Sequence, residues 1–184
     1  MITESSILRD IGFIVGSALD RAGVTAVLSG GGAATIWAPD AIQSEDLDFI
    51  LTMHRATASA QEALAALGFE RDNDEYRHPV TKYFLEFPPG PLSIGDELIT
   101  SWSTLEQGEL CVHVLSPTDS CRDRLAAFYP WNDRSSLTAA LAIARAQSSR
   151  MDFYCIPKRS EKEGSLEKYL EFERRSQSGG SAQP

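Results

Sequence analysis

The sequence has few of the residues that mark several common functional classes. Its three cysteines form no CxxC pair, and neither they nor the three histidines have the spacing of a zinc site. We therefore expect the cysteines to be free thiols in a reducing compartment. Lys and Arg number 17 against 26 Asp and Glu, giving a net charge of -9. This balance argues against a constitutive, non-specific nucleic-acid binder, but it leaves room for a local basic patch that contacts RNA.

Long apolar segments are missing as well. No apolar run approaches the length of a membrane span, and the polar, acidic N-terminus lacks the pattern of a signal peptide. We therefore expect a cytoplasmic protein with no membrane partner. The 184 residues, 42% of them hydrophobic, are typical of one globular domain with a small helical annex.

Hydrophobic periodicity predicts an α/β (α+β) fold, in which a small mixed, twisted sheet with flanking helices precedes a helical C-terminal region. The expected helices cover 5–22, 56–67, 121–129, 135–148 and 160–175. The expected strands cover 24–29, 44–53, 81–87 and 109–115, with a hairpin or weak edge strand over 69–78 and a connector over 92–108. Pro130 is expected to break its helix. The predicted regions are a core over 1–115, a helical region over 116–175 and a disordered tail over 176–184.

The most informative stretch begins with a short apolar run that enters three consecutive glycines, Gly30, Gly31 and Gly32. Glycine has no Cβ and permits positive φ, so successive N–H groups can converge on an anion. The helix expected after the turn adds its positive N-terminal end. The turn is neither a Walker loop nor a dinucleotide fingerprint, because Gly-Lys-Ser/Thr and GxGxxG are both absent. We therefore interpret it as a turn that contacts phosphate.

Two carboxylates, Asp46 and Asp48, open the next predicted strand. Residues two apart in a strand point to the same face, so these side chains project together. Glu86 lies late in strand 81–87, which can pair with the Asp46–Asp48 strand. Such an oxygen-rich set suits Mg²⁺ and the substrate phosphates that Mg²⁺ carries. The alternative for the paired acids alone is a solvated strand end.

This order of strand, glycine turn, Ser-x-Asp-Leu-Asp strand and later acidic strand resembles the nucleotidyltransferase superfamily of the DNA polymerase beta type. The small bacterial members, including those of toxin–antitoxin and abortive-infection systems, are the most similar. The resemblance covers about residues 5–150. It implies that the glycine turn contacts the nucleotide phosphates and that Asp46 and Asp48 bind Mg²⁺ or Mn²⁺. It also implies that Glu86 completes the site as a third ligand or as the base.

Other residues have supporting roles in this interpretation. The family usually has Gly-Ser in the turn, and either Ser29 or Ser44 can supply the missing hydroxyl. Lys82 can contact a phosphate, or it can form a cross-strand ion pair with the third carboxylate. The resemblance also implies a basic residue on the following helix, either Arg122 or Arg124, and a loop aspartate, Asp133.

The predicted function is metal-dependent transfer of a nucleoside monophosphate from a nucleoside triphosphate to an acceptor hydroxyl. The acceptor can be an RNA end, a protein or a small molecule, and the resemblance adds a toxin–antitoxin setting with a cognate partner. The alternative is a catalytically inactive protein of the same fold that acts as an antitoxin-like or partner-binding module. Glu86, where the family usually has Asp, keeps this alternative open. A plain phosphate-binding α/β domain is a third hypothesis.

Overall fold

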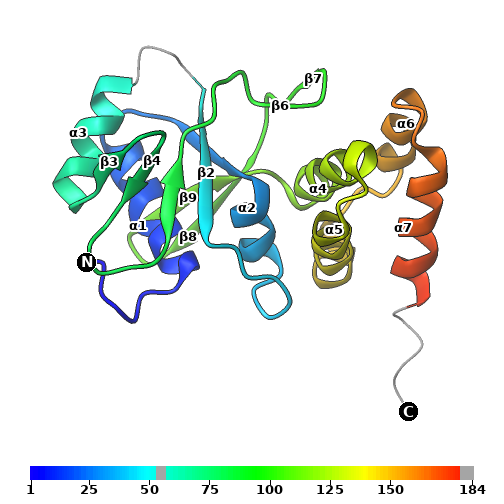
Figure 1. Ribbon diagram of the computed structural model, residues 1–184, viewed down its shortest axis with the longest axis horizontal. Coiled ribbons are helices and arrows are strands. Elements are labelled where there is room, and N and C mark those ends of the chain that lie inside the picture. Colours follow the sequence, from blue (N-terminus) through cyan, green and yellow to red (C-terminus); the bar gives the residue numbers. More distant parts are fainter. Residues whose placement is uncertain (53–56, 179–184) are drawn as a thin grey trace.

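A computed structural model describes residues 1–52 and 57–178 (Figure 1). None of the helices in these two ranges is long and apolar enough to cross a membrane. The elements follow one another in the order α1 (Leu8–Arg21), β1 (Ala26–Ser29), α2 (Gly30–Trp37), β2 (Asp46–Leu51), α3 (Thr57–Leu67), β3 (Glu70–Asp72), β4 (Glu75–Arg77), β5 (Phe84–Glu86), β6 (Ser93–Ile94), β7 (Glu97–Leu98), β8 (Ser103–Gln107), β9 (Leu110–Val114), α4 (Pro117–Trp131), α5 (Arg134–Ala146), η2 (Ser148–Arg150), α6 (Cys155–Lys162) and α7 (Leu166–Ser178).

Seven strands form one mixed sheet in the order β3-β4-β5-β2-β1-β9-β8. The central strand β2 runs antiparallel to β1 and parallel to β5, and β9 runs parallel to β1. The outer pairs β3–β4, β4–β5 and β8–β9 are antiparallel. The sheet is therefore the mixed one that the sequence predicts, and the expected pairing of the two acidic strands, β2 and β5, is confirmed.

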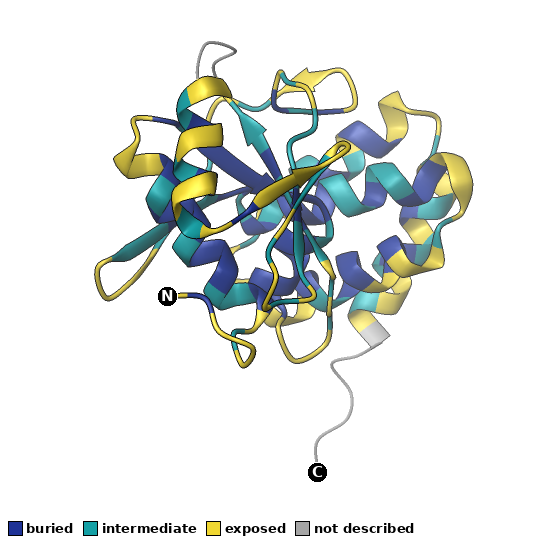
Figure 2. Ribbon diagram, turned by 60° about the vertical axis from the view of Figure 1, so that its left-hand side comes forward, coloured by how far each residue is buried: buried dark blue, intermediate teal, exposed yellow. Residues whose placement is uncertain are grey.

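The two faces of the sheet have different surroundings. Leu47 and Phe49 of β2 are fully buried in the main core, together with residues of α1 and α2. Because strand side chains alternate, Asp46 and Asp48 lie on the opposite face with Ile50. Buried positions concentrate where the helices meet the sheet, and exposed positions lie on the outer surfaces of the helices (Figure 2). The carboxylates therefore lie on the face of β2 opposite the core that Leu47 and Phe49 form with α1 and α2.

The C-terminal helices form an annex beside the sheet (Figure 1). Helices α4 and α5 pack against each other and against α2, and α6 and α7 lie outside them. Two hydrogen bonds fix the junction: the Trp37 indole donates to the Leu115 carbonyl oxygen at 2.9 Å in a buried contact, and the Gln147 amide donates to the Trp37 carbonyl oxygen at 2.9 Å in a partly buried one. Helix α2 is thus held between the end of the sheet and α5.

Four predictions about secondary structure are wrong in detail. Helix α4 continues past Pro130 to Trp131, because the proline lies so near the end that little helix follows it. The single helix expected over 160–175 is two helices, α6 and α7, because the chain turns at Gly164 with φ +65°. The connector 92–108 contains β6, β7 and β8. Helix α7 also includes 176–178 of the predicted tail, and 179–184 lie outside the described residues.

A charged contact joins the small β6–β7 hairpin to the annex, and we call it the hairpin latch. Glu97 accepts hydrogen bonds from two buried guanidiniums, those of Arg122 on α4 and Arg159 on α6. Asp119 also pairs with Arg122, at 2.8 Å, and Glu163 also pairs with Arg159. The hairpin turn sits so close to the Arg159 guanidinium that a Cβ on Gly95 would collide with it. One carboxylate thus links two helices of the annex to the middle of the chain.

Replacing Glu97 by alanine should lower the free energy of unfolding by about 2 kcal/mol, because two buried guanidiniums each lose a carboxylate partner. Urea denaturation measures this loss. The matched control is Lys162→Ala, which removes a 2.8 Å ion pair with Asp96 in which both side chains are about two-thirds exposed. Such an exposed pair contributes at most about 1 kcal/mol. Equal losses for the two variants would contradict a stabilising role of the latch.

Candidate functional site

The glycine triplet brings helix α2 against β2. The three glycines were expected to form a turn before the helix, but they are the first three residues of α2. Only Gly30 has the positive φ of a turn residue, +62°. A Cβ on Gly30 would collide with Asp48 Oδ2, and one on Gly31 would lie 2.5 Å from Ser44 Oγ. A Cβ on Gly32 would lie 3.1 Å from the Asp46 carbonyl oxygen. The absence of side chains therefore lets the N-terminal end of α2 approach both aspartates.

Hydrogen bonds orient the paired aspartates. Ser44 Oγ donates to Asp46 Oδ1, and the Ser44 backbone N–H donates to Thr35 Oγ1 at 3.1 Å. Thr35 in turn donates to the Gly31 carbonyl oxygen at 3.1 Å, which ties this loop to α2. On the neighbouring strand β1, Ser29 Oγ donates to the Asp48 carbonyl oxygen at 3.3 Å. The Ser44 hydroxyl thus orients the Asp46 carboxylate and lies close to the N-terminal end of α2.

The third predicted carboxylate lies one strand away. In the β2–β5 ladder Asp48 is paired with Glu86, and in the β4–β5 ladder Glu86 is paired with Glu75. Directly paired residues share a face, so three acids form a row across three strands. Burial and the charges of Asp46 and Glu75 raise the pKa of Glu86. Like charges placed opposite one another destabilise a sheet, so the row costs stability when no cation is bound.

Asp48 has the most strongly perturbed carboxyl group of the site. Burial raises its pKa from the ordinary 3.8 to about 6, and the charges of Asp46 and Glu86 add to this effect. The Arg124 guanidinium acts in the opposite direction. Close acidic groups with raised pKa values are common at functional sites.

The pKa of Asp48 gives a pH dependence of stability. A carboxyl group whose pKa is raised in the folded state favours folding at low pH, and this contribution is lost as pH rises through about 6. The difference corresponds to about 3 kcal/mol at pH 8. In metal-free buffer, Asp48→Asn should therefore raise the melting temperature by about 6–12 °C at pH 8 and by much less at pH 4.5. Thermal unfolding at both pH values measures this, and an equal shift at both would contradict it.

Both aspartates face a cavity of about 500 Å³ between the sheet and the annex. Its walls come from the start of α2, the loop after it, β2, α4 and α5. The lining residues are Gly31, Ala41, Ile42, Gln43, Ser44, Asp46, Asp48, Arg124, Ser135, Ser136, Thr138 and Ala139. The cavity thus combines two carboxylates, one guanidinium, several hydroxyl groups and a helix N-terminus, all from separate parts of the chain.

The start of α5 supplies two of these hydroxyl groups. Asp133 caps the helix: its carboxylate accepts the Ser135 backbone N–H at 2.9 Å and the Ser136 hydroxyl at 2.6 Å. The hydroxyls of Ser136 and Ser135 lower the pKa of Asp133 to about 2. Asp133, which the resemblance offered as a loop acid, therefore has a structural role as a helix cap here. Neither serine is among the predicted site residues, although Asp-x-Ser-Ser is a recognisable helix start.

Several predicted site residues do not line this cavity. Lys82 precedes β5 and pairs with Glu45 at 3.5 Å, with both side chains mostly exposed. It therefore forms an ion pair, but not with the third carboxylate. Arg122 is buried in the hairpin latch, whereas Arg124, two residues later on α4, lines the cavity. Glu86 lies next to Asp48 in the sheet but outside the cavity wall.

The site offers two carboxylates as ligands for a divalent metal ion. Within the described parts of the chain, no group of three His, Cys, Asp or Glu side chains is close enough to hold a metal ion. The two aspartates nevertheless fit Mg²⁺ or Mn²⁺ in chemistry, since both offer hard oxygen atoms on one face of β2. Burial and, to a smaller extent, the charges of Asp46 and Glu86 raise the pKa of Asp48, and a bound cation would favour its ionised form. Remaining ligands would come from water and substrate phosphates, as is usual for Mg²⁺.

Comparison with known proteins supports the fold. No protein-family model matches this chain, and no curated protein matches it. The crystal structure of an antigenic nucleotidyltransferase-like protein from Paracoccidioides brasiliensis matches with a TM-score of 0.67 and 16% identity over 95% of this chain and 94% of that chain. The solution structure of the antibiotic-resistance factor ANT(2'')-Ia matches with a TM-score of 0.48 and 13% identity, over 86% of this chain and 94% of that one. The first match confirms a nucleotidyltransferase-like fold.

Proposed function

We propose that this chain is a metal-dependent nucleotidyltransferase that moves a nucleoside monophosphate from a nucleoside triphosphate to an acceptor hydroxyl. One observation carries the proposal: Asp46 and Asp48 project side by side into a cavity that the glycine-rich start of α2 also lines. The nucleotidyltransferase-like fold supports it. A cytoplasmic setting and a cognate toxin or antitoxin partner belong to the same proposal.

The residues of the cavity divide the work. Asp46 and Asp48 would hold the metal, which would supply positive charge that stabilises the phosphates during transfer. The N-terminal end of α2 and the Arg124 guanidinium attract the triphosphate. Ser44 keeps Asp46 in place, and Glu86 acts beside Asp48 as a further ligand or as the base. The cavity volume of about 500 Å³ is within the usual range for small-ligand sites, about 300–1,000 Å³.

The first test is nucleotide binding. Mg²⁺ with a nucleoside triphosphate at about 100 times its Kd should raise the melting temperature by about 5–10 °C, because ligand binding stabilises the folded state by mass action. Asp46→Asn should abolish this shift. Glu45→Gln, the neighbouring acid with a mostly exposed side chain, is the matched control and should preserve it. A shift that survives Asp46→Asn would instead support a plain phosphate-binding domain.

The second test is transfer itself. The protein is incubated with each labelled triphosphate and a cell extract, and the extract is searched for a labelled RNA, protein or small molecule. Two observations favour the inactive, partner-binding alternative: Glu86 lies outside the cavity wall, and no three acids of the described residues are close enough together to hold a metal ion. That alternative predicts that no component of the extract becomes labelled with any of the triphosphates, even if the protein binds nucleotide.

A further inference from the structure

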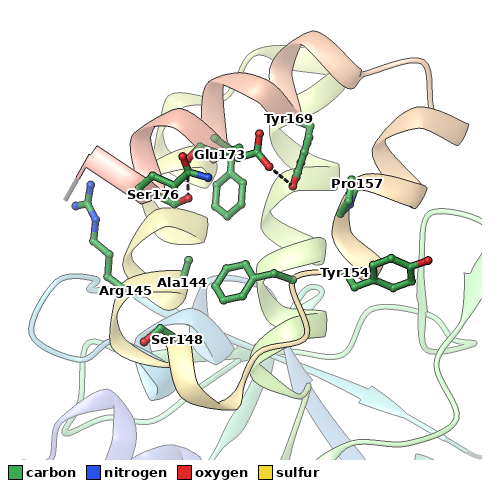
Figure 3. Close-up of a pocket in the computed structure, with 11 residues that line it drawn as sticks. Ala144, Arg145, Ser148, Tyr154, Pro157, Tyr169, Glu173 and Ser176 are labelled. Atoms are coloured by element: carbon green, nitrogen blue, oxygen red, sulfur yellow. Dashed lines mark hydrogen bonds between the residues drawn. The ribbon is translucent and has the colours of Figure 1, made fainter. Parts of the chain in front are cut away.

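A second cavity, of about 610 Å³, lies within the annex (Figure 3). It is lined by α5, η2, the segment before α6, the start of α6, and α7, so none of its walls belongs to the sheet. No residue of the proposed catalytic cavity lines it. Nothing in the proposed reaction uses this space, so the proposed function gives no reason for its lining.

The walls of this annex cavity are largely aromatic. Phe172 is 1% exposed and Tyr169 8% exposed, and their ring centroids are 6.2 Å apart. At the mouth, Phe153 is 41% exposed and Tyr154 72% exposed. Large aromatic side chains that remain open to solvent around a concave space are typical of binding sites. The rings offer apolar contact to a ligand body, and a ring can also offer a negative π face to a cation. Lys158 already lies 4.1 Å from the centroid of the Tyr154 ring, so that face would come from the other rings.

One carboxylate, that of Glu173, enters this aromatic space. It accepts a hydrogen bond from the Tyr169 hydroxyl at 3.1 Å, as drawn in Figure 3. Burial raises the pKa of Tyr169 to about 12, with further contributions from its hydrogen bond to Glu173 and from the Glu173 charge, so the phenol remains a donor. Glu173 is only partly exposed, and no basic side chain of residues 1–52 and 57–178 lies within ion-pair distance of it. By contrast Glu171, two residues earlier, pairs with Arg134 and Arg175.

The one basic residue among the described residues that line this cavity is Arg145, and it is placed differently from Glu173. Arg145 is exposed at the rim, and its guanidinium donates to the Arg175 carbonyl oxygen at 3.1 Å. In Figure 3 it lies at the side of the cavity away from Tyr154. An exposed charge is already solvated and gains little from a ligand, whereas a partly buried carboxylate without a cation gains the most. The charge balance of the interior therefore favours a positive ligand.

We propose that the annex cavity binds an organic cation, a protonated amine carried on an aromatic or similarly bulky apolar body, with Glu173 pairing the amine. The aromatic walls take the apolar body, and the volume suits a ligand of drug-like size. The site is separate from the proposed nucleotidyl-transfer site and does not depend on it.

Three probes of matched shape and different charge test the proposal: phenethylamine, 2-phenylethanol and phenylacetate. Each is titrated into the full-length protein, and binding is followed by calorimetry or by NMR shifts. The amine should bind at least about 10-fold more tightly than the alcohol, and the acid should bind most weakly. Glu173→Gln should reduce amine affinity to that of the alcohol, while Glu167→Gln, on the same helix but outside this cavity, should leave it unchanged.

Two further variants separate this proposal from folding and from catalysis. Phe153→Ala, at an exposed ring that is cheap to remove, should weaken the amine and the alcohol alike. Asp48→Asn should leave amine binding intact, even if it abolishes nucleotide binding. The proposal is overturned if none of the probes binds, if the three bind equally, or if amine binding survives Glu173→Gln in a folded protein.

Discussion

Asp48→Asn is expected to lower the rate of nucleotidyl transfer by about 1,000-fold, which corresponds to the several kcal/mol that a bound metal supplies to charge stabilisation. The substitution removes one of two negative groups that hold the cation and keeps the shape of the side chain. Steady-state rates with the preferred triphosphate, at saturating Mg²⁺, measure the loss.

The same variant provides its own folding control. Because ionised Asp48 costs stability above pH 6, the variant should be more stable than the parent in metal-free buffer at pH 8. Loss of activity in a more stable protein cannot be ascribed to unfolding. The neighbouring variant Glu45→Gln should retain nearly full activity, since that side chain is mostly exposed. Transfer at the parental rate by Asp48→Asn would refute the proposed role.

Gly30→Ala should lower the rate by about 100-fold, because the new Cβ would collide with Asp48 Oδ2 and the carboxylate would have to rotate away. The residue also has φ +62°, a backbone conformation that costs alanine about 1–2 kcal/mol. Both activity and the free energy of unfolding should therefore fall. Rates and urea denaturation, measured on the same preparation, report the two effects separately.

Gly23→Ala isolates the collision from the backbone strain. Gly23 has a similar φ of +72°, but a Cβ there would meet no atom within 4 Å. Both alanine variants should lose about the same stability, and only Gly30→Ala should lose activity. If Gly23→Ala were equally inactive, strain rather than displacement of Asp48 would explain the result.

The arrangement of the acids could be predicted because it follows from local rules. A period of two places Asp46 and Asp48 on one face wherever the strand lies. The pairing of Glu86 with Asp48 required one assumption, that the two acidic strands are neighbours, and the β2–β5 ladder confirms it. Contact of the glycine triplet with phosphate stays a prediction, and what the structure shows is that its Cβ-free positions face the two aspartates and Ser44.

The rest of the cavity depends on contacts between distant segments, which no local pattern encodes. Whether Arg122 or Arg124 lines the site depends on how α4 is rotated against α2 and α5, and in the observed rotation Arg122 belongs to the hairpin latch. Lys82 lies within the predicted strand 81–87, but β5 begins only at Phe84. Lys82 therefore precedes the strand, and its side chain pairs with Glu45. The serines of α5 enter the site only because the annex folds back.

The hairpin latch also has a consequence for the order of events during synthesis. Glu97 and Arg159 are 62 residues apart in the chain. At about 5–20 residues per second, the ribosome adds the intervening segment in roughly 3–12 s. During that time every strand of the sheet has been made, while Glu97 has only Arg122 to pair with. Emergence of α6 is therefore the step that fastens the β6–β7 hairpin, and a nascent chain that stalls before Arg159 would carry a complete sheet with that hairpin held at one helix only.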